Sequence, residues 1–238
     1  MIVAFRLDPS SLNLHPSALQ MPDSSPQRPG AVTWLGLFIA LFGMLIVRQL
    51  VNYVWPDPTF ASALMKEAGM WLVAIALFVI IRVGEGLPLS SIGLGTARWG
   101  KSVLSGFLLG LSCLVVAVGL VALTKYTGGE AGKAFDKLPT WLLSLIVLRA
   151  GVVEELCYRG YAIERLHALG LPRGVAAGVP LLIFGLGHWT GGWANILIAL
   201  VLGGILALFF IWRRDLVANM IGHWFVDFIG NVLPRLVP

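Results

Sequence analysis

The sequence predicts an all-α protein that crosses a lipid bilayer several times, and three observations lead to this fold class. Hydrophobic residues fill 58% of the 238 positions, and charged residues fill only 12%, about half the share in soluble domains. The mean hydropathy is +0.86. The apolar residues are gathered in runs of about 20 or more, the length that spans a bilayer as a helix. Because a soluble protein needs polar and charged side chains over much of its outside, a chain as apolar as this one is expected in a membrane.

Seven segments have the length and composition of membrane helices. They are residues 31–54, 62–82, 103–124, 140–166, two spans within 174–212, and 216–233. Residues 174–212 contain no Asp, Glu, Lys or Arg over 39 positions, and we expect this stretch to divide near Thr190-Gly191-Gly192. The sequence therefore predicts a polytopic bundle of about seven transmembrane helices.

The bundle is expected to form one domain, residues 31–238, preceded by a polar tail. Residues 1–30 contain five prolines and many serines, without the apolar stretch and cleavage site of a signal peptide. This composition predicts disorder.

The Lys and Arg residues between the spans predict the orientation, because cytoplasmic loops carry an excess of positive charge. A cytoplasmic N-terminus places nine of them inside and four outside, the four being Lys125, Lys133, Lys137 and Arg235. We expect a multi-pass protein of the plasma (inner) membrane with a cytoplasmic N-terminus. The net charge of +5 is assigned to these loops, and no nucleic-acid partner is expected.

Charges inside the predicted spans are unusual, since one near the bilayer centre costs about 2.5–3.5 kcal/mol. Arg48, Lys66 and Glu67 lie near helix ends, from where their charged groups can reach the interface. The remaining charges in the spans belong to two motifs in the C-terminal half or flank them, which indicates a function there.

The first motif is EELCYR at residues 154–159, inside the fourth span. Glu155 and Arg159 are four residues apart and share a helix face, so we expect them to pair. Glu154 lies about 100° around the helix and has no obvious local partner, which makes it a candidate general base. The alternative is a buried ion-pair network that only holds helices together.

Two histidines lie in later spans. His188 ends the motif FGLGH that begins at Phe184, and His223 shares a helix face with Asp227, four residues on. Glu154, His188 and His223 each lie about 12–18 Å along their helices from the predicted cytoplasmic ends, so they fall in one layer. The alternatives are a core histidine with its hydrogen bonds satisfied and a His–Asp pair that only fixes a helix.

A glutamate and two histidines at one depth can activate water, directly or through Zn²⁺, and so support hydrolysis of an amide. The G-x-S-x-G elbow of serine hydrolases and the H-E-x-x-H motif of zincins are absent from the sequence. The carboxylate of Asp227 would fix the orientation of the His223 ring, or would donate a hydrogen bond as a neutral acid.

Together, E-E-x-x-x-R, F-x-x-x-H and H-x-x-x-[N/D], each on its own apolar helix, resemble the CPBP family. That family contains the CAAX prenyl endopeptidases of the Rce1 type and their bacterial Abi relatives. In this sequence the motifs are Glu154, Glu155 and Arg159; Phe184 and His188; His223 and Asp227. The resemblance covers about residues 138–233.

The resemblance implies an intramembrane endopeptidase that opens to the cytoplasmic side. Its substrate would be a membrane-embedded or lipidated peptide, the prenylated CAAX type being one class. By position, Glu154 and His188 would activate the attacking water, while His223 and Asp227 would support the oxyanion.

Glu155, Arg159 and Phe184 are implied as supporting residues. The family pattern allows Asn or Asp at the last position, and this chain has Asp227. Because an ionised Asp would repel an oxyanion, we expect Asp227 to orient His223 instead.

No cofactor is expected if Glu154 acts without a metal, which is the version that we favour. The alternative is Zn²⁺ held by Glu154, His188 and His223 with an open position for water.

A different class of function also fits the same buried residues. A transporter, immunity protein or scaffold could use Glu154, His188 and His223 as a proton or ion site. Transporters more often show two related halves with broken helices, and no such repeat is visible in this sequence. The protease is therefore the leading hypothesis.

Overall fold

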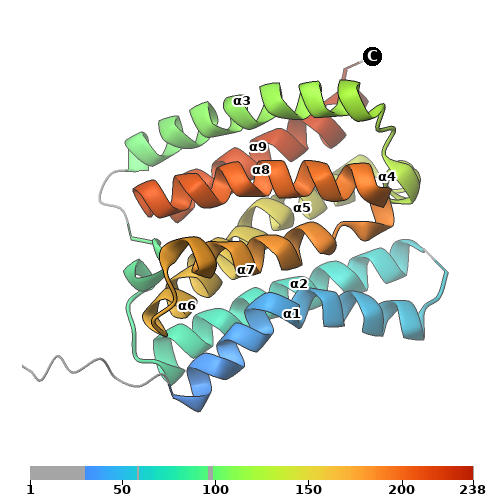
Figure 1. Cartoon of the computed structure of the whole chain (residues 1–238). Coiled ribbons are helices and arrows are strands. Elements are labelled where there is room, and N and C mark those ends of the chain that lie inside the picture. The colour runs from blue at the N-terminus through green and yellow to red at the C-terminus, as the bar shows by residue number, and fades with distance from the viewer. Residues whose placement is uncertain (1–29, 58, 96–98, 238) are drawn as a thin grey trace, which may run out of the picture.

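The computed structural model describes residues 30–57, 59–95 and 99–237, and every regular element in these ranges is a helix (Figure 1). The fold class predicted from composition is thus confirmed. Apart from Gly30, the polar tail expected over residues 1–30 lies outside the described residues.

The elements follow one another along the chain in this order. They are α1 (Ala31–Val54), α2 (Phe60–Val79) with its π-helical end η3 (Ile80–Gly84), the short 3-10 helix η4 (Leu89–Ile92), α3 (Trp99–Thr124), α4 (Gly129–Asp136), a continuous helix of α5 (Thr140–Arg149), η5 (Ala150–Ile163) and α6 (Glu164–Ala168), α7 (Arg173–Leu186), the 3-10 turn η6 (Trp189–Gly191), α8 (Gly192–Arg213), and α9 (Leu216–Asp227) continued by η7 (Phe228–Val232) and η8 (Leu233–Arg235).

Five helices within the described ranges are long and apolar enough to cross a membrane. They are Ala31–Val54, Phe60–Gly84, Trp99–Thr124, Trp189–Arg213 and Leu216–Arg235. The other two predicted spans are also helical, but Thr140–Ala168 carries several charges and α7 has only 14 residues. A helix of that length measures about 21 Å, short of the hydrocarbon core of about 30 Å. The predicted count of about seven is therefore not confirmed.

The continuous helix α5–η5–α6 is the centre of the bundle (Figure 1). Its middle segment η5 contacts α1, α2, α7 and α9, and twelve of the fourteen η5 residues are buried. The charged motif at residues 154–159 lies within η5, which has the i→i+5 hydrogen bonding of a π-helix. The charges are thus held inside protein and away from lipid.

Glycines allow α3 and α9 to pack closely. A methyl carbon placed at Gly106 would lie 2.7 Å from Cβ of Ile221, and one at Gly110 would lie 3.0 Å from the Gly222 carbonyl oxygen. Small residues at such positions are how membrane helices approach one another. This contact fixes α9, and with it His223 and Asp227, against the rest of the bundle.

Candidate active site

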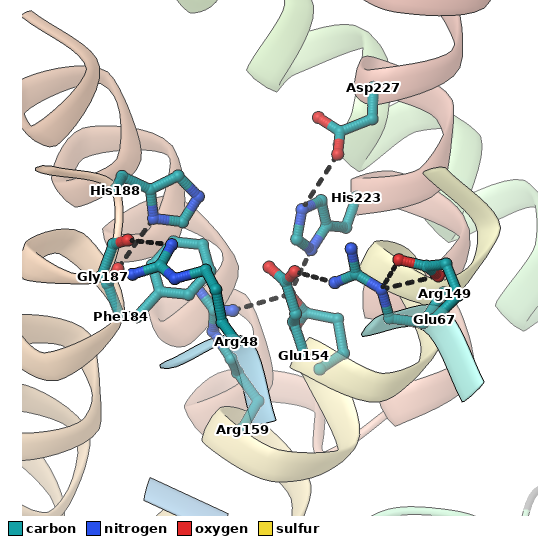
Figure 2. A network of polar contacts seen from close by, with 11 residues as sticks. Arg48, Glu67, Arg149, Glu154, Arg159, Phe184, Gly187, His188, His223 and Asp227 are labelled. Carbon is teal, nitrogen blue, oxygen red and sulfur yellow. Dashed lines mark hydrogen bonds and ion pairs between the residues drawn. The ribbon is translucent and has the colours of Figure 1, made fainter. Parts of the chain in front are cut away.

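The three motifs converge in the interior of the bundle (Figure 2). Glu154, Glu155 and Arg159 come from η5, Phe184 and His188 come from the end of α7, and His223 and Asp227 come from α9. The structure therefore brings all the residues predicted from the sequence into one region.

Glu155 accepts three hydrogen bonds in this region and is completely buried. Its Oε1 accepts hydrogen bonds from Nη1 of Arg159 at 2.7 Å and from Nδ1 of His223 at 2.8 Å. Its Oε2 accepts one from Nδ2 of Asn219 at 3.1 Å. The predicted Glu155–Arg159 pair is confirmed, and the same carboxylate also ties η5 to α9.

Arg159 makes two further contacts besides its ion pair with Glu155. Its Nη2 donates to the Gly203 carbonyl oxygen at 3.1 Å, and its guanidinium carbon lies 4.5 Å from the centre of the Phe184 ring. Because a guanidinium over an aromatic face is an attractive arrangement, Phe184 supports Arg159 as well as packing against His188, whose ring centre is 4.7 Å away.

Glu154 has a partner, contrary to the expectation from the sequence. Its Oε1 accepts from Nη1 of Arg149 at 2.5 Å, and Nε of Arg149 contacts both carboxylate oxygens of Glu67 at 3.2 and 3.3 Å. Among the described residues, none donates a hydrogen bond to Oε2 of Glu154. One oxygen is thus fixed by the ion pair, while the other can still accept a hydrogen bond.

His188 lies at the turn where α7 ends. Its Nδ1 is 2.8 Å from the Phe184 carbonyl oxygen, which can only accept, so Nδ1 carries the proton and Nε2 is an acceptor in the neutral ring. Helix α7 ends at Leu186 and the 3-10 turn η6 begins at Trp189, so His188 lies between the two elements. His188 can therefore accept a hydrogen bond from a water or a substrate through Nε2.

His223 is oriented first by Glu155 and only second by Asp227. Nε2 of His223 lies 3.6 Å from Oδ2 of Asp227, beyond hydrogen-bond length, whereas its Nδ1 is 2.8 Å from Glu155. Asp227 is more open than His223, with 33% of its side chain exposed against 11%. The predicted pairing along the helix is present, but the orienting contact comes from another helix.

Four residues of the site were not assigned to it from the sequence. Glu67 was expected to reach the membrane interface, yet it is 3% exposed and pairs with Arg149. Arg48 was given the same role, yet its Nη1 donates to the Gly187 carbonyl oxygen at 3.1 Å. Asn219 is buried against Glu155. Arg149 had one usable signal, a cation inside a span five residues before Glu154.

The metal set named from the sequence does not form in this arrangement. Within the residues that the structure describes, no group of three His, Cys, Asp or Glu side chains is placed to hold a metal ion. Glu154 gives one oxygen to Arg149, and His223 faces a carboxylate on each side of its ring. The described residues therefore do not fit a Glu154–His188–His223 zinc site without rearrangement.

The fold and the site define a class: a multi-pass helical membrane protein with a buried glutamate–histidine cluster. Residues 136–229 match the family model described as type II CAAX prenyl endopeptidase Rce1-like. This range contains all three motifs, so the resemblance inferred from them is confirmed over that segment, and the match supports a CAAX-type intramembrane protease in general. No curated protein and no solved structure matches the chain.

Proposed function

We propose that this chain is an intramembrane endopeptidase that hydrolyses a peptide bond in a membrane-associated substrate, such as a prenylated CAAX-type peptide. The observation that supports it most directly is the geometry at Glu154. One of its carboxylate oxygens is fixed by Arg149 and the other has no donor among the described residues, in the segment that matches the protease family.

In the proposed reaction Glu154 takes a proton from water while the water oxygen bonds to the carbonyl carbon of the substrate. The carbonyl π electrons move to oxygen, which gives a tetrahedral oxyanion. His188 accepts a hydrogen bond from the water through Nε2 and so directs it. Collapse of the intermediate breaks the C–N bond, and Glu154 returns its proton to the leaving amine.

Glu67 and Glu155 act through other side chains and are positioning residues. Glu67 holds Arg149, which holds Glu154. Glu155 holds His223. The arrangement thus gives each reacting side chain a second group that fixes its direction, as hydrolytic sites commonly do.

Replacement of Glu154 tests this function. The purified chain in detergent or liposomes is mixed with a prenylated peptide and with unmodified peptides, and products are identified by mass spectrometry. Glu154→Gln keeps the shape but cannot take the proton, so cleavage is expected to disappear. His188→Ala should reduce it strongly. Cleavage that survived Glu154→Gln would rule out the mechanism.

Chelation tests the metal-free version of the reaction. Dialysis against a strong chelator is expected to leave cleavage unchanged. A loss of cleavage that added Zn²⁺ restores would favour the alternative Glu154–His188–His223 ligand set and a rearranged site.

The proton- or ion-coupled alternative has one observation in its favour. Two series of linked polar contacts, Glu67–Arg149–Glu154 and Arg159–Glu155–His223, lie inside the bundle, and such series also occur in transporters. Proton uptake by liposomes that contain the chain, with no cleavage of any peptide, would favour this role.

The orientation in the membrane bears on the substrate. Figure 1 shows α1 beginning at the end of the bundle where α6 lies, whereas α4 lies at the opposite end, and α4 contacts η6 next to His188. A cytoplasmic N-terminus therefore puts the His188 end outside, although the family resemblance implied a cytoplasmic opening. A cytoplasmic N-terminus and a cytoplasmic opening are compatible only if the substrate enters the site from the end of the bundle where α6 lies.

Cysteine labelling decides the orientation. Cys113 and Cys157 are buried, so background labelling should be low. With the N-terminus inside, Lys137→Cys should react with an impermeant maleimide added to intact cells, and Arg213→Cys should react only after lysis. The reverse pattern would contradict the positive-charge count.

A further inference from the structure

Arg48 differs from the other two arginines of the site in having an unpaired charge. Its Nη1 donates to the Gly187 carbonyl oxygen at 3.1 Å, but its Nη2 is buried with no hydrogen-bond partner in the protein. Among the described residues the only other buried side-chain nitrogen or oxygen in this condition is Oδ1 of Asn219. A charged donor left unused in the interior is costly, so a ligand that uses it would be bound favourably.

The surroundings of Arg48 contrast with those of its neighbours. Arg149 and Arg159 each contact a carboxylate within 3.3 Å, whereas no ion pair of Arg48 with another described residue is found. Figure 2 shows the Arg48 guanidinium next to the His188 ring. Arg48 on α1 therefore brings to the His188 side of the site a positive charge that has no ion-pair partner among the described residues.

The opposite wall, on α9, is poorly suited to a developing negative charge. There the ring of His223 lies between two carboxylates, with Nδ1 2.8 Å from Glu155 and Nε2 3.6 Å from Asp227. A carboxylate at position 227 would repel an oxyanion, where a neutral asparagine would donate to it. A donor from another element would therefore add to the stabilisation of an oxyanion.

We propose that Nη2 of Arg48 donates to the substrate carbonyl oxygen as it becomes an oxyanion, which makes Arg48 a catalytic residue of the proposed peptidase. This inference rests on the proposed function. In the attack step one proton passes from water to Glu154 and the carbonyl π pair becomes the oxyanion. The negative charge thus moves from Glu154 to the substrate oxygen, where a fixed guanidinium donor stabilises it.

The experiment compares Arg48→Gln and Arg48→Lys with the wild-type chain and with Arg213→Gln, which removes an exposed arginine outside the site. Steady-state cleavage gives kcat and KM separately for a peptide that the wild type cleaves. Binding is measured for two ligands, the intact peptide and a peptide phosphonate, which is a stable tetrahedral anion of the same sequence. The proteins used for binding also carry Glu154→Gln, so that the intact peptide is not cleaved.

Loss of an oxyanion donor lowers kcat by about 10²–10³-fold and should leave KM nearly unchanged. The phosphonate should bind more weakly to Arg48→Gln by a similar factor, while the uncleaved peptide should bind as before. Arg48→Lys keeps the charge without the planar fork, so its kcat should be intermediate. Arg213→Gln should behave as wild type.

The remaining outcomes overturn the inference. A raised KM with an unchanged kcat would mean that Arg48 binds an anionic group of the substrate away from the reacting bond. Equal losses of phosphonate and peptide binding would mean that Arg48 has a structural role. If Arg48→Gln fails to fold, the same comparison is made with Arg48→Lys. A wild-type chain that cleaves no peptide removes the proposed function and the inference together, whereas an active wild type with an unaffected Arg48→Gln removes only the inference.

Discussion

Replacing Glu155 by glutamine turns a charged carboxylate, which accepts three hydrogen bonds inside the bundle, into a neutral amide. Glutamine has nearly the same shape, but its amide presents a donor where the carboxylate presents a second acceptor. Two of the three hydrogen bonds come from Arg159 at 2.7 Å and His223 at 2.8 Å. Glu155 is 0% exposed and Arg159 is 1% exposed, so water cannot replace the missing partner.

Breaking a buried ion pair from one side costs about 3–5 kcal/mol, because the remaining charge stays buried without compensation. We expect Glu155→Gln to lose that much free energy of unfolding, measured by titrating detergent-solubilised protein with SDS and following tryptophan fluorescence. Adding Arg159→Met removes the stranded charge and should recover about 2–3 kcal/mol of the loss as coupling energy.

Glu164→Gln is the matched control for this measurement. Glu164 also pairs with an arginine at short range, 2.6 Å from Arg214, but that arginine side chain is 43% exposed. Exposed pairs contribute about 0–1 kcal/mol. The stabilising role of the buried Glu155–Arg159 pair would be refuted by either of two results. One is a loss of unfolding free energy in Glu155→Gln no larger than in this control, and the other is simple additivity of the losses from the changes at 155 and 159.

Two further predictions concern positioning and packing. Glu67→Gln should lower kcat by about 10–100-fold with little change in KM, because Arg149 loses the carboxylate that orients it; a kcat equal to that of the wild type would show that Arg149 needs no second partner. Gly106→Ala places a methyl group 2.7 Å from Cβ of Ile221 and should cost about 1–3 kcal/mol in the same SDS titration. The matched change Gly119→Ala meets no atom within 4 Å and should be neutral or stabilising by about 0.5–1 kcal/mol, so similar losses at both positions would contradict the close α3–α9 contact.

Contacts along one helix could be predicted because helix geometry alone fixes them. Residues four apart lie on one face, and this placed Glu155 beside Arg159 and His223 beside Asp227 before any fold was known. The absence of a local partner for Glu154 was a weaker argument, because its partner Arg149 is five residues away along the same helix. In the π-helical segment η5, which begins directly after Arg149, residues five apart come close.

Contacts between helices could not be predicted in this way. Glu67 and Arg149 are 82 positions apart, and Arg48 and Gly187 are 139 apart. Each of these charges has a plausible role in isolation, such as reaching the membrane interface from a helix end. Only the packing of α1 and α2 against η5 and α7 shows that Arg48 and Glu67 face inward.

The sequence by itself determined the bilayer as the solvent, the helical class and the three motifs, because long apolar runs can span a bilayer only as helices and a charge within such a run stands out. The tertiary structure decided how those motifs act on one another. It gave Glu155 the task of orienting His223, gave Glu154 an arginine, and left one donor of Arg48 unused. The physical reason is that most charges in these spans find their partners across a helix interface. The hydropathy of the sequence shows that a charge is present, but it does not show the helix packing that supplies the partner.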